Sequence, residues 1–130
     1  MKFLLDTHVW LWSLLEPELL SAESRRELED AKSQCWLSPI SVWEAAVLVR
    51  KGRLRLEMDL EKWVAEGVRR VGLIEAPLTM EIVLAGERLE LKHADPADRF
   101  LAATAVALNL TLVTADQRLL TSPGISVLEA

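Results

Sequence analysis

Short runs of apolar residues alternate along this chain with longer stretches in which apolar positions recur at helical spacing. The run from Lys2 to Leu5 predicts a buried strand, and a helical pattern follows it at once. Ser38-Pro39 is typical of a helix start, and Gly52 of a helix end. The expected strands are residues 2–5, 35–37, 73–76, 110–113 and 125–128. The expected helices are residues 7–15, 22–32, 39–51, 60–71, 80–89, 97–108 and 116–120, with 53–58 either a loop or a short extension.

Strands separated by helices of this length predict right-handed βαβ units and a parallel sheet covered by helices on both faces. We therefore expect an α/β fold of three layers with about five strands, forming a single domain over residues 1–130. The chain shows no repeat and no linker. In such sheets ligands bind beyond the carboxyl ends of the strands, where the strand order reverses. The residues at those ends are therefore the first candidates for a site.

The composition supports a folded protein, with 51% apolar and 27% charged residues. Cys35 is the only cysteine, which excludes an internal disulfide and a multi-cysteine zinc site and favours a reduced cytosolic setting. The opening segment superficially resembles a signal peptide, but Asp6 and His8 interrupt its apolar run. No apolar stretch reaches the roughly 18 residues of a membrane span. We expect a cytoplasmic protein without a membrane segment.

The formal net charge of −5 argues against a simple nucleic-acid binder, because such proteins are usually basic. A divalent cation held in an acidic pocket would reverse the sign of the charge locally. The chain also has one basic stretch, which either contacts phosphates or is a solvated loop. That stretch contains Arg50, Lys51, Arg53 and Arg55.

Four carboxylates occupy positions that suggest a shared site. Asp6 follows the first expected strand, and Asp116 follows the strand at 110–113. Asp98 lies in the first turn of the helix after Pro96, and Glu44 lies within an otherwise apolar helix. Each has a structural explanation as well: helix caps for the two strand-end acids, a helix dipole for Asp98, and a solvated stripe for Glu44.

Taken together, the four carboxylates favour a metal site. Carboxylates gathered in one crevice repel each other unless a cation lies among them. A site with only oxygen ligands suits Mg²⁺ or Mn²⁺. Such a cation lowers the pKa of a bound water and polarises a phosphoryl group, which is the chemistry of phosphodiester hydrolysis.

Several phrases of the sequence resemble the PIN domain family, and more narrowly its VapC-type toxins. They span the chain in the family's order, which makes the resemblance specific. The phrases are Leu4-Leu5-Asp6-Thr7-His8, Ser38-Pro39-Ile40-Ser41-Val42-Trp43-Glu44, His93-Ala94-Asp95-Pro96-Ala97-Asp98-Arg99, Ala102-Ala103-Thr104-Ala105 and Val113-Thr114-Ala115-Asp116.

The resemblance implies a five-stranded parallel sheet between helices, with an acidic metal site at its carboxyl edge. It implies that Asp6, Glu44, Asp98 and Asp116 are the catalytic, metal-binding carboxylates for Mg²⁺ or Mn²⁺. Thr114 matches a hydroxyl that steadies the first acid.

Three further residues are candidates for supporting this site. Thr7 lies beside the first acid. Asp95 is three residues before Asp98 and can face the same pocket, as an additional ligand or as a support. Arg99 either contacts a phosphate or neutralises the carboxylates.

The resemblance also implies an RNA substrate, an antitoxin that wraps around the protein and blocks the acidic pocket, and a homodimer. The five tryptophans are consistent with such interfaces, since aromatic residues are enriched there. Trp36 and Trp43 are nevertheless expected in the core. Trp10 and Trp12 cannot share one helix face, so one of them is expected to be exposed.

His8, His93 and Cys35 are expected to have no chemical role. A lone histidine is more often a surface residue, or one whose hydrogen bonds are satisfied, than a catalyst. A single cysteine in an apolar strand is expected to pack in the core.

Two other phosphate-handling folds fit the sequence poorly. A response-regulator receiver needs paired acids after the first strand, a phosphoaccepting Asp after the third and a Lys near the last. Here Asp6 has no acidic neighbour, Glu75 has no Asp after it, and no lysine follows Lys92. A dehalogenase-like phosphatase needs a second Asp where His8 stands.

Two further alternatives share the PIN fold: a housekeeping RNA-processing nuclease and a catalytically inactive binding module. All four acids are present, which argues against the inactive module. The small size favours a toxin endoribonuclease over the processing enzyme. A neighbouring short reading frame that encodes an antitoxin would discriminate between them.

Overall fold

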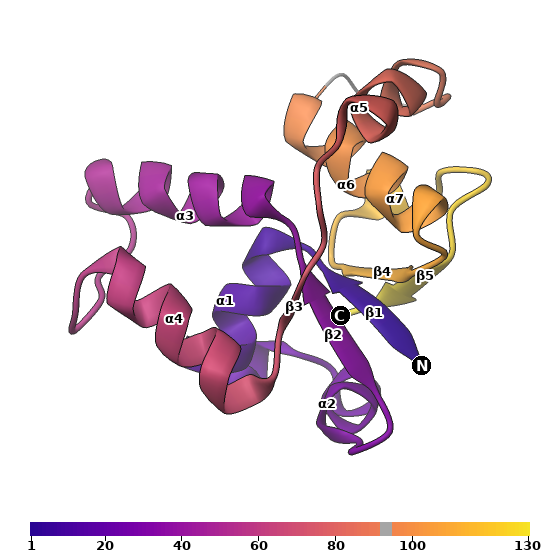
Figure 1. Cartoon of the computed structure of the whole chain (residues 1–130). Helices are drawn as coiled ribbons and strands as arrows, with labels where there is room; N and C mark the ends of the chain where they lie inside the picture. Colours follow the sequence, from indigo (N-terminus) through magenta and orange to yellow (C-terminus); the bar gives the residue numbers. More distant parts are fainter. Residues whose placement is uncertain (92–94) are drawn as a thin grey trace.

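The computed structural model describes residues 1–91 and 95–130. A five-stranded sheet lies at its centre, with strands in the order β3-β2-β1-β4-β5 (Figure 1). Neighbouring strands are parallel throughout. The strands are β1 (Lys2–Leu5), β2 (Gln34–Leu37), β3 (Ile74–Glu75), β4 (Thr111–Thr114) and β5 (Val127–Glu129). The predicted parallel α/β fold is confirmed.

The helices begin where the sequence has capping residues. In the described residues they are α1 (Thr7–Leu15), α2 (Ala22–Glu29), α3 (Pro39–Arg50), α4 (Leu60–Val71), α5 (Met80–Glu87), α6 (Pro96–Ala107) and α7 (Gln117–Leu120), with a 3₁₀ turn η1 (Pro17–Leu19). Ser21, Ser38 and Thr79 each accept a backbone hydrogen bond at the start of a helix. Gly52 takes a left-handed φ of +71° just beyond α3. Residues 53–58 form a loop.

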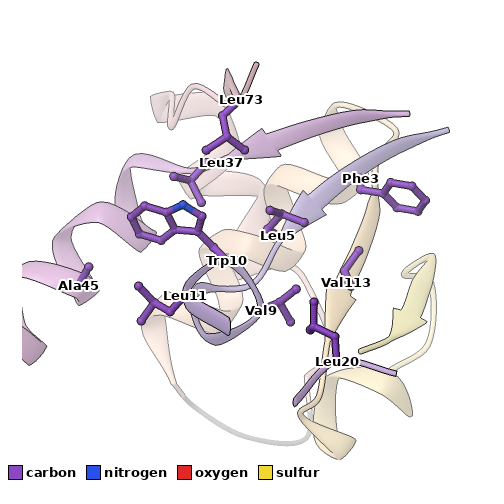
Figure 2. Close-up of a cluster of buried hydrophobic side chains, with 10 residues drawn as sticks. All are labelled: Phe3, Leu5, Val9, Trp10, Leu11, Leu20, Leu37, Ala45, Leu73 and Val113. Carbon is purple, nitrogen blue, oxygen red and sulfur yellow. The ribbon is translucent and has the colours of Figure 1, made fainter. Parts of the chain in front are cut away.

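The two faces of the sheet are separated by the alternation of side chains along each strand. Phe3 and Leu5 of β1 point to one face, where they pack with α1 around Trp10 and with Leu20 (Figure 2). Val113 of β4 joins them there. The indole of Trp10 also packs on a second indole, that of Trp63 from α4, at 5.1 Å between ring centroids. This face is therefore covered by the first half of the chain.

The other face is covered mainly by α6. Leu4 of β1 and Leu112 of β4 point away from the first cluster and pack with Leu101 and Ala105 of α6. Leu119 of α7 belongs to the same cluster. All five of these side chains are fully or almost fully buried. Helices therefore cover both faces, and the predicted three-layer arrangement is confirmed.

The sheet order sets where a ligand can bind. From β1 the chain moves outward through β2 to β3, and it then returns to place β4 on the other side of β1. The strand order therefore reverses between β1 and β4, and the backbone N–H of Asp6 donates to the carbonyl of Val113 across this junction at 3.0 Å. The carboxyl ends of these two strands form the crevice at which such folds bind ligands.

Some tryptophan predictions are wrong. Trp43 is 57% exposed, because α3 turns Ser41 and Ala45 inward and leaves this neighbouring position outside. On α1, one of the two tryptophans was expected to be exposed. Trp10 is buried, and Trp12 is only half-exposed. It packs against the core and lies 6.1 Å from the ring of His8. Trp36 is half-buried against the α6 cluster.

The secondary structure differs from the prediction mainly at element ends. Helix α2 stops at Glu29 rather than near Lys32, since Asp30 takes an extended conformation. Cys35 is half-buried at the edge of the core. Within the described residues no helix is long and apolar enough to cross a membrane.

Candidate active site

Asp6 stands at the point where β1 becomes α1. It is the N-cap of α1, and its Oδ1 accepts a hydrogen bond from the backbone N–H of Thr7 at 2.7 Å. Its Oδ2 accepts a second hydrogen bond from the hydroxyl of Thr114, at 2.6 Å. The two bonds orient the carboxylate at the carboxyl end of the sheet. The capping role and the proposed site role are thus compatible.

Thr114 connects Asp6 to the turn that carries Asp116. It is the last residue of β4 and is fully buried. While its hydroxyl donates to Asp6, its oxygen accepts a hydrogen bond from the backbone N–H of Asp116 at 3.1 Å. Asp116 is the N-cap of α7. One hydroxyl therefore ties together the acids of two adjacent strands.

Glu44 reaches the same region from α3. Its Oε1 accepts a hydrogen bond from the hydroxyl of Thr7 at 2.5 Å. Thr7 Oγ1 also lies 2.9 Å from the hydroxyl oxygen of Ser41, one turn before Glu44 on the same helix. Thr7 and Ser41 are both buried. The backbone of Thr7 thus holds Asp6, and its side chain holds Glu44.

Asp98 and Asp95 both lie at the start of α6. Asp98 is in the first turn and only 9% exposed. Asp95 is exposed and is the N-cap of α6, where it accepts a hydrogen bond from the backbone N–H of Ala97 at 2.9 Å. Asp98 is therefore the more buried of the two acids at this helix start.

The surroundings of Asp6 shift the pKa of its carboxyl group. Burial raises its pKa above the ordinary value, and the negative charge of Asp116 raises it further. Hydrogen bonds from Thr114 and Thr7 lower the pKa without cancelling the effect of burial. The electrostatic interaction with His8 also lowers the pKa, so burial is the main reason that the pKa of Asp6 stays raised.

The surroundings of Glu44 shift its pKa in the same direction. Burial raises its pKa, and the hydrogen bond from Thr7 opposes this effect. The charges of Asp6, Asp95 and Asp98 raise the pKa of Glu44 as well. The carboxylates from α1, α3 and α6 are therefore close enough to repel one another.

These groups fit a divalent cation chemically. The donors are carboxylate and hydroxyl oxygens, which are the ligands that Mg²⁺ and Mn²⁺ prefer. Over residues 1–91 and 95–130 no three His, Cys, Asp or Glu side chains form a group that could hold a metal ion. Magnesium does not require one, because it usually keeps several waters and takes one or two carboxylates together with substrate phosphates.

A comparison with protein families agrees with this geometry. Residues 3–122 match the family described as PIN domain, which covers most of the chain. This chain belongs to the PIN domain family. The matched range includes all four principal acids: Asp6, Glu44, Asp98 and Asp116.

Comparison with individual proteins shows which type of PIN domain this chain is. The PIN domain is 34% identical over 119 residues to Ribonuclease VapC22 of Mycobacterium tuberculosis, covering 89% of this chain and 88% of that protein. It is thus of the VapC type. Its fold matches a chain of VapBC2 from Rickettsia felis bound to a promoter DNA fragment, at a TM-score of 0.75 and 18% identity, covering 99% and 98% of the two chains. A chain of DNA-bound VapBC from Salmonella typhimurium matches at a TM-score of 0.72 and 20% identity, with the same coverage.

One predicted neighbour of this PIN domain site is engaged elsewhere. Arg99 points its guanidinium at α5, where Nη1 donates to the backbone carbonyls of Gly86 and Leu89, each at 3.1 Å. Arg99 therefore ties α6 to the end of α5 rather than neutralising the acids or awaiting a phosphate. The cause is that α5 and α6 pack against each other here, since a Cβ added at Gly86 would be in ordinary van der Waals contact with Ala103 and with the carbonyl oxygen of Arg99. His93 lies outside the described residues.

The structure also brings two residues to the PIN domain site that the sequence analysis did not single out. Ser41 shares a face of α3 with Glu44 and contacts Thr7, and its spacing of three residues was the available signal. Arg118 follows Asp116 by two residues and pairs with it directly. Nothing in the sequence distinguishes this arginine from the others.

Proposed function

We propose that this PIN domain is a metal-dependent endoribonuclease, the toxin of a toxin–antitoxin pair. In this proposal Asp6, Glu44, Asp98 and Asp116 hold one or two Mg²⁺ or Mn²⁺ ions. The observation that supports it is that Asp6, Glu44 and Asp98 act on one another electrostatically at the switch point, where Thr114 also links Asp6 to Asp116. The ribonuclease activity of the VapC22 relative supports the same reaction. We expect the protein to act in the cytoplasm.

The mechanism assigns each residue a specific task. Asp6, Glu44, Asp98 and Asp116 would hold the cation, which would lower the pKa of an attacking water and polarise the scissile phosphoryl group. The hydroxyl of Thr114, at the end of β4, orients Asp6 through its hydrogen bond. The hydroxyl of Thr7, at the start of α1, orients Glu44 in the same way. Such outer hydrogen bonds fix the orientation of ligating carboxylates. Asp95 remains a capping residue that adds negative charge at the rim.

Removal of the metal provides the direct test. We expect the purified chain to cleave a structured RNA with Mg²⁺ or Mn²⁺, to lose that cleavage in EDTA, and to regain it when excess Mn²⁺ is added. The preparation must be free of any bound antitoxin, because a blocked pocket would imitate inactivity. Cleavage that continues unchanged in EDTA would contradict the proposal.

An antitoxin partner follows from the toxin role. The folds of this chain and of the VapBC chains agree, and those proteins are toxin–antitoxin complexes. A groove of about 620 Å³ between the end of α1 and α4 offers an apolar surface for such a partner. Its lining includes the exposed side chains of Leu15, Met58 and Val71, with Arg70 beside them.

We also propose a homodimer, supported by apolar side chains that α5 leaves outside the fold. Met80 and Leu84 lie one turn apart and are 86% and 62% exposed. Light scattering should give twice the 14.6 kDa of one chain, and Leu84→Glu should return it to one chain. Addition of the product of a neighbouring short reading frame should raise the mass again. A single-chain mass under both conditions would contradict both partners.

A further inference from the structure

Arg118 places its charge directly on one of the proposed metal-binding acids. Its Nε lies 3.3 Å from Asp116 Oδ1, and its Nη2 lies 3.1 Å from Asp116 Oδ2. The guanidinium therefore contacts both oxygens of the carboxylate at once. The side chain of Arg118 is 57% exposed, and that of Asp116 is 25% exposed. A long, exposed side chain thus contacts Asp116 at the protein surface.

This contact is not needed to cap α7. The backbone N–H of Arg118 already donates to Asp116 Oδ1 at 2.8 Å, which any residue at this position except proline could do. The guanidinium adds a second, separate set of hydrogen bonds. The guanidinium contact is therefore an ion pair with the acid itself, separate from the helix cap.

The other acids of the site also act on Arg118. The hydrogen bond with Asp116 raises the pKa of Arg118, and the charges of Asp116, Asp98 and Asp95 raise it further. The positive charge of the arginine therefore interacts favourably with these three acids. A divalent cation in the same site would supply that charge more strongly.

A guanidinium and a divalent cation repel each other, so they compete for Asp116. Binding of either one to Asp116 weakens the binding of the other, and by thermodynamic linkage the two effects are equal. Once a cation binds Asp116, the exposed guanidinium of Arg118 is released beside the acidic residues. Its planar fork matches the oxygens of a phosphate group.

We propose that Arg118 is a phosphate-binding residue that pairs with Asp116 in the metal-free protein and passes to the RNA backbone when the cation takes Asp116. The inference rests on the proposed function. It gives an acidic protein, of net charge −5, a local positive group where the substrate must approach. It also makes metal binding and substrate binding cooperative, because the cation releases the group that holds the RNA.

Removal of the side chain should change the two affinities in opposite directions. Arg118→Ala should bind Mn²⁺ about two- to fivefold more tightly than wild type in titration calorimetry, the range expected from an exposed ion pair. The matched control is Arg69→Ala, since Arg69 forms an exposed ion pair with Glu66 at 2.9 Å on α4. That control should leave the Mn²⁺ affinity unchanged.

Binding to RNA is measured in saturating Mn²⁺ with a labelled unstructured oligoribonucleotide, in an Asp98→Asn background so that cleavage is slow. Arg118→Ala should weaken binding by up to about fivefold at low salt. The slope of log affinity against log salt should fall by about 0.7, the value for one phosphate contact on a single strand. Arg118→Lys, which keeps the charge but loses the fork, should recover the slope and only part of the affinity.

The outcomes distinguish a failure of this inference from a failure of the proposed function. Tighter Mn²⁺ binding together with weaker RNA binding supports the proposal, because a merely structural arginine would weaken both. An unchanged Mn²⁺ affinity or an unchanged salt slope in Arg118→Ala overturns it, provided that thermal melting shows a folded variant. No Mn²⁺ binding by the wild type overturns the proposed metal chemistry itself, and the inference with it.

Discussion

Asp98→Asn is expected to reduce RNA cleavage by at least about a hundredfold, since loss of a ligand should exceed the effect of losing a residue that only orients one. Asparagine has nearly the same shape as aspartate but lacks its charge. Asp98 is almost buried in the first turn of α6, and its charge acts on Glu44. The amide therefore removes one anionic ligand without leaving a gap. Single-turnover cleavage of an end-labelled RNA measures the effect.

The same variant should melt no earlier than wild type in the absence of metal. Removal of the charge relieves repulsion with Glu44, so the fold loses a destabilising interaction. Asp59→Asn is the matched control, because Asp59 is an exposed N-cap of α4 and asparagine caps a helix equally well. The control should keep full activity. An Asp98→Asn protein that cleaves RNA at the wild-type rate would remove Asp98 from the site.

Thr114→Val is expected to reduce cleavage by about 10- to 100-fold while every proposed metal ligand remains in place. Valine fills the same buried space but cannot donate to Asp6 or accept from the backbone N–H of Asp116. Both acids then lose their common support. The unfolding free energy should fall by about 1–3 kcal/mol, the usual cost of a buried polar group without a partner. Cleavage rate and urea unfolding measure the two effects.

Two further variants separate orientation of the acids from general damage to the strand. Thr114→Ser keeps the hydroxyl and should restore most of the activity. Thr111→Val removes a hydroxyl from the same strand, where it lies 3.0 Å from that of Ser126 and away from the acids. That variant should cleave RNA normally. Wild-type cleavage by a folded Thr114→Val protein would show that Asp6 needs no such support.

The elements of this fold are largely determined by local sequence. Side chains alternate between two apolar faces in β1, as Phe3 and Leu4 show, so both faces of the sheet were predictable as buried. Helix starts were predictable because the side chains of Ser38 and Thr79 cap the first turn of their own helices, which is a local interaction. Strand ends were predicted less well. Strand β3 is shorter than expected, since its pairing covers only Ile74 and Glu75.

The candidate site was predictable in its acids but not in their connections. Asp6 and Asp116 stand out because they follow strands, and the resemblance to the PIN domain named Glu44 and Asp98 as well. That Thr114 supports two of these acids at once depends on β1 and β4 being adjacent. The chain between those strands spans roughly a hundred residues, so no local pattern records the contact.

The sequence by itself determined the class of fold, the order of its elements and the acids that suit a metal. The tertiary structure alone decided which side chains meet. It directed Arg99 to the carbonyls of α5, turned Trp43 to the surface, and placed Arg118 on Asp116. The physical reason is that periodicity and capping act within a few residues. The partner of a long polar side chain, in contrast, is whichever charge or carbonyl the packing of distant elements brings within reach.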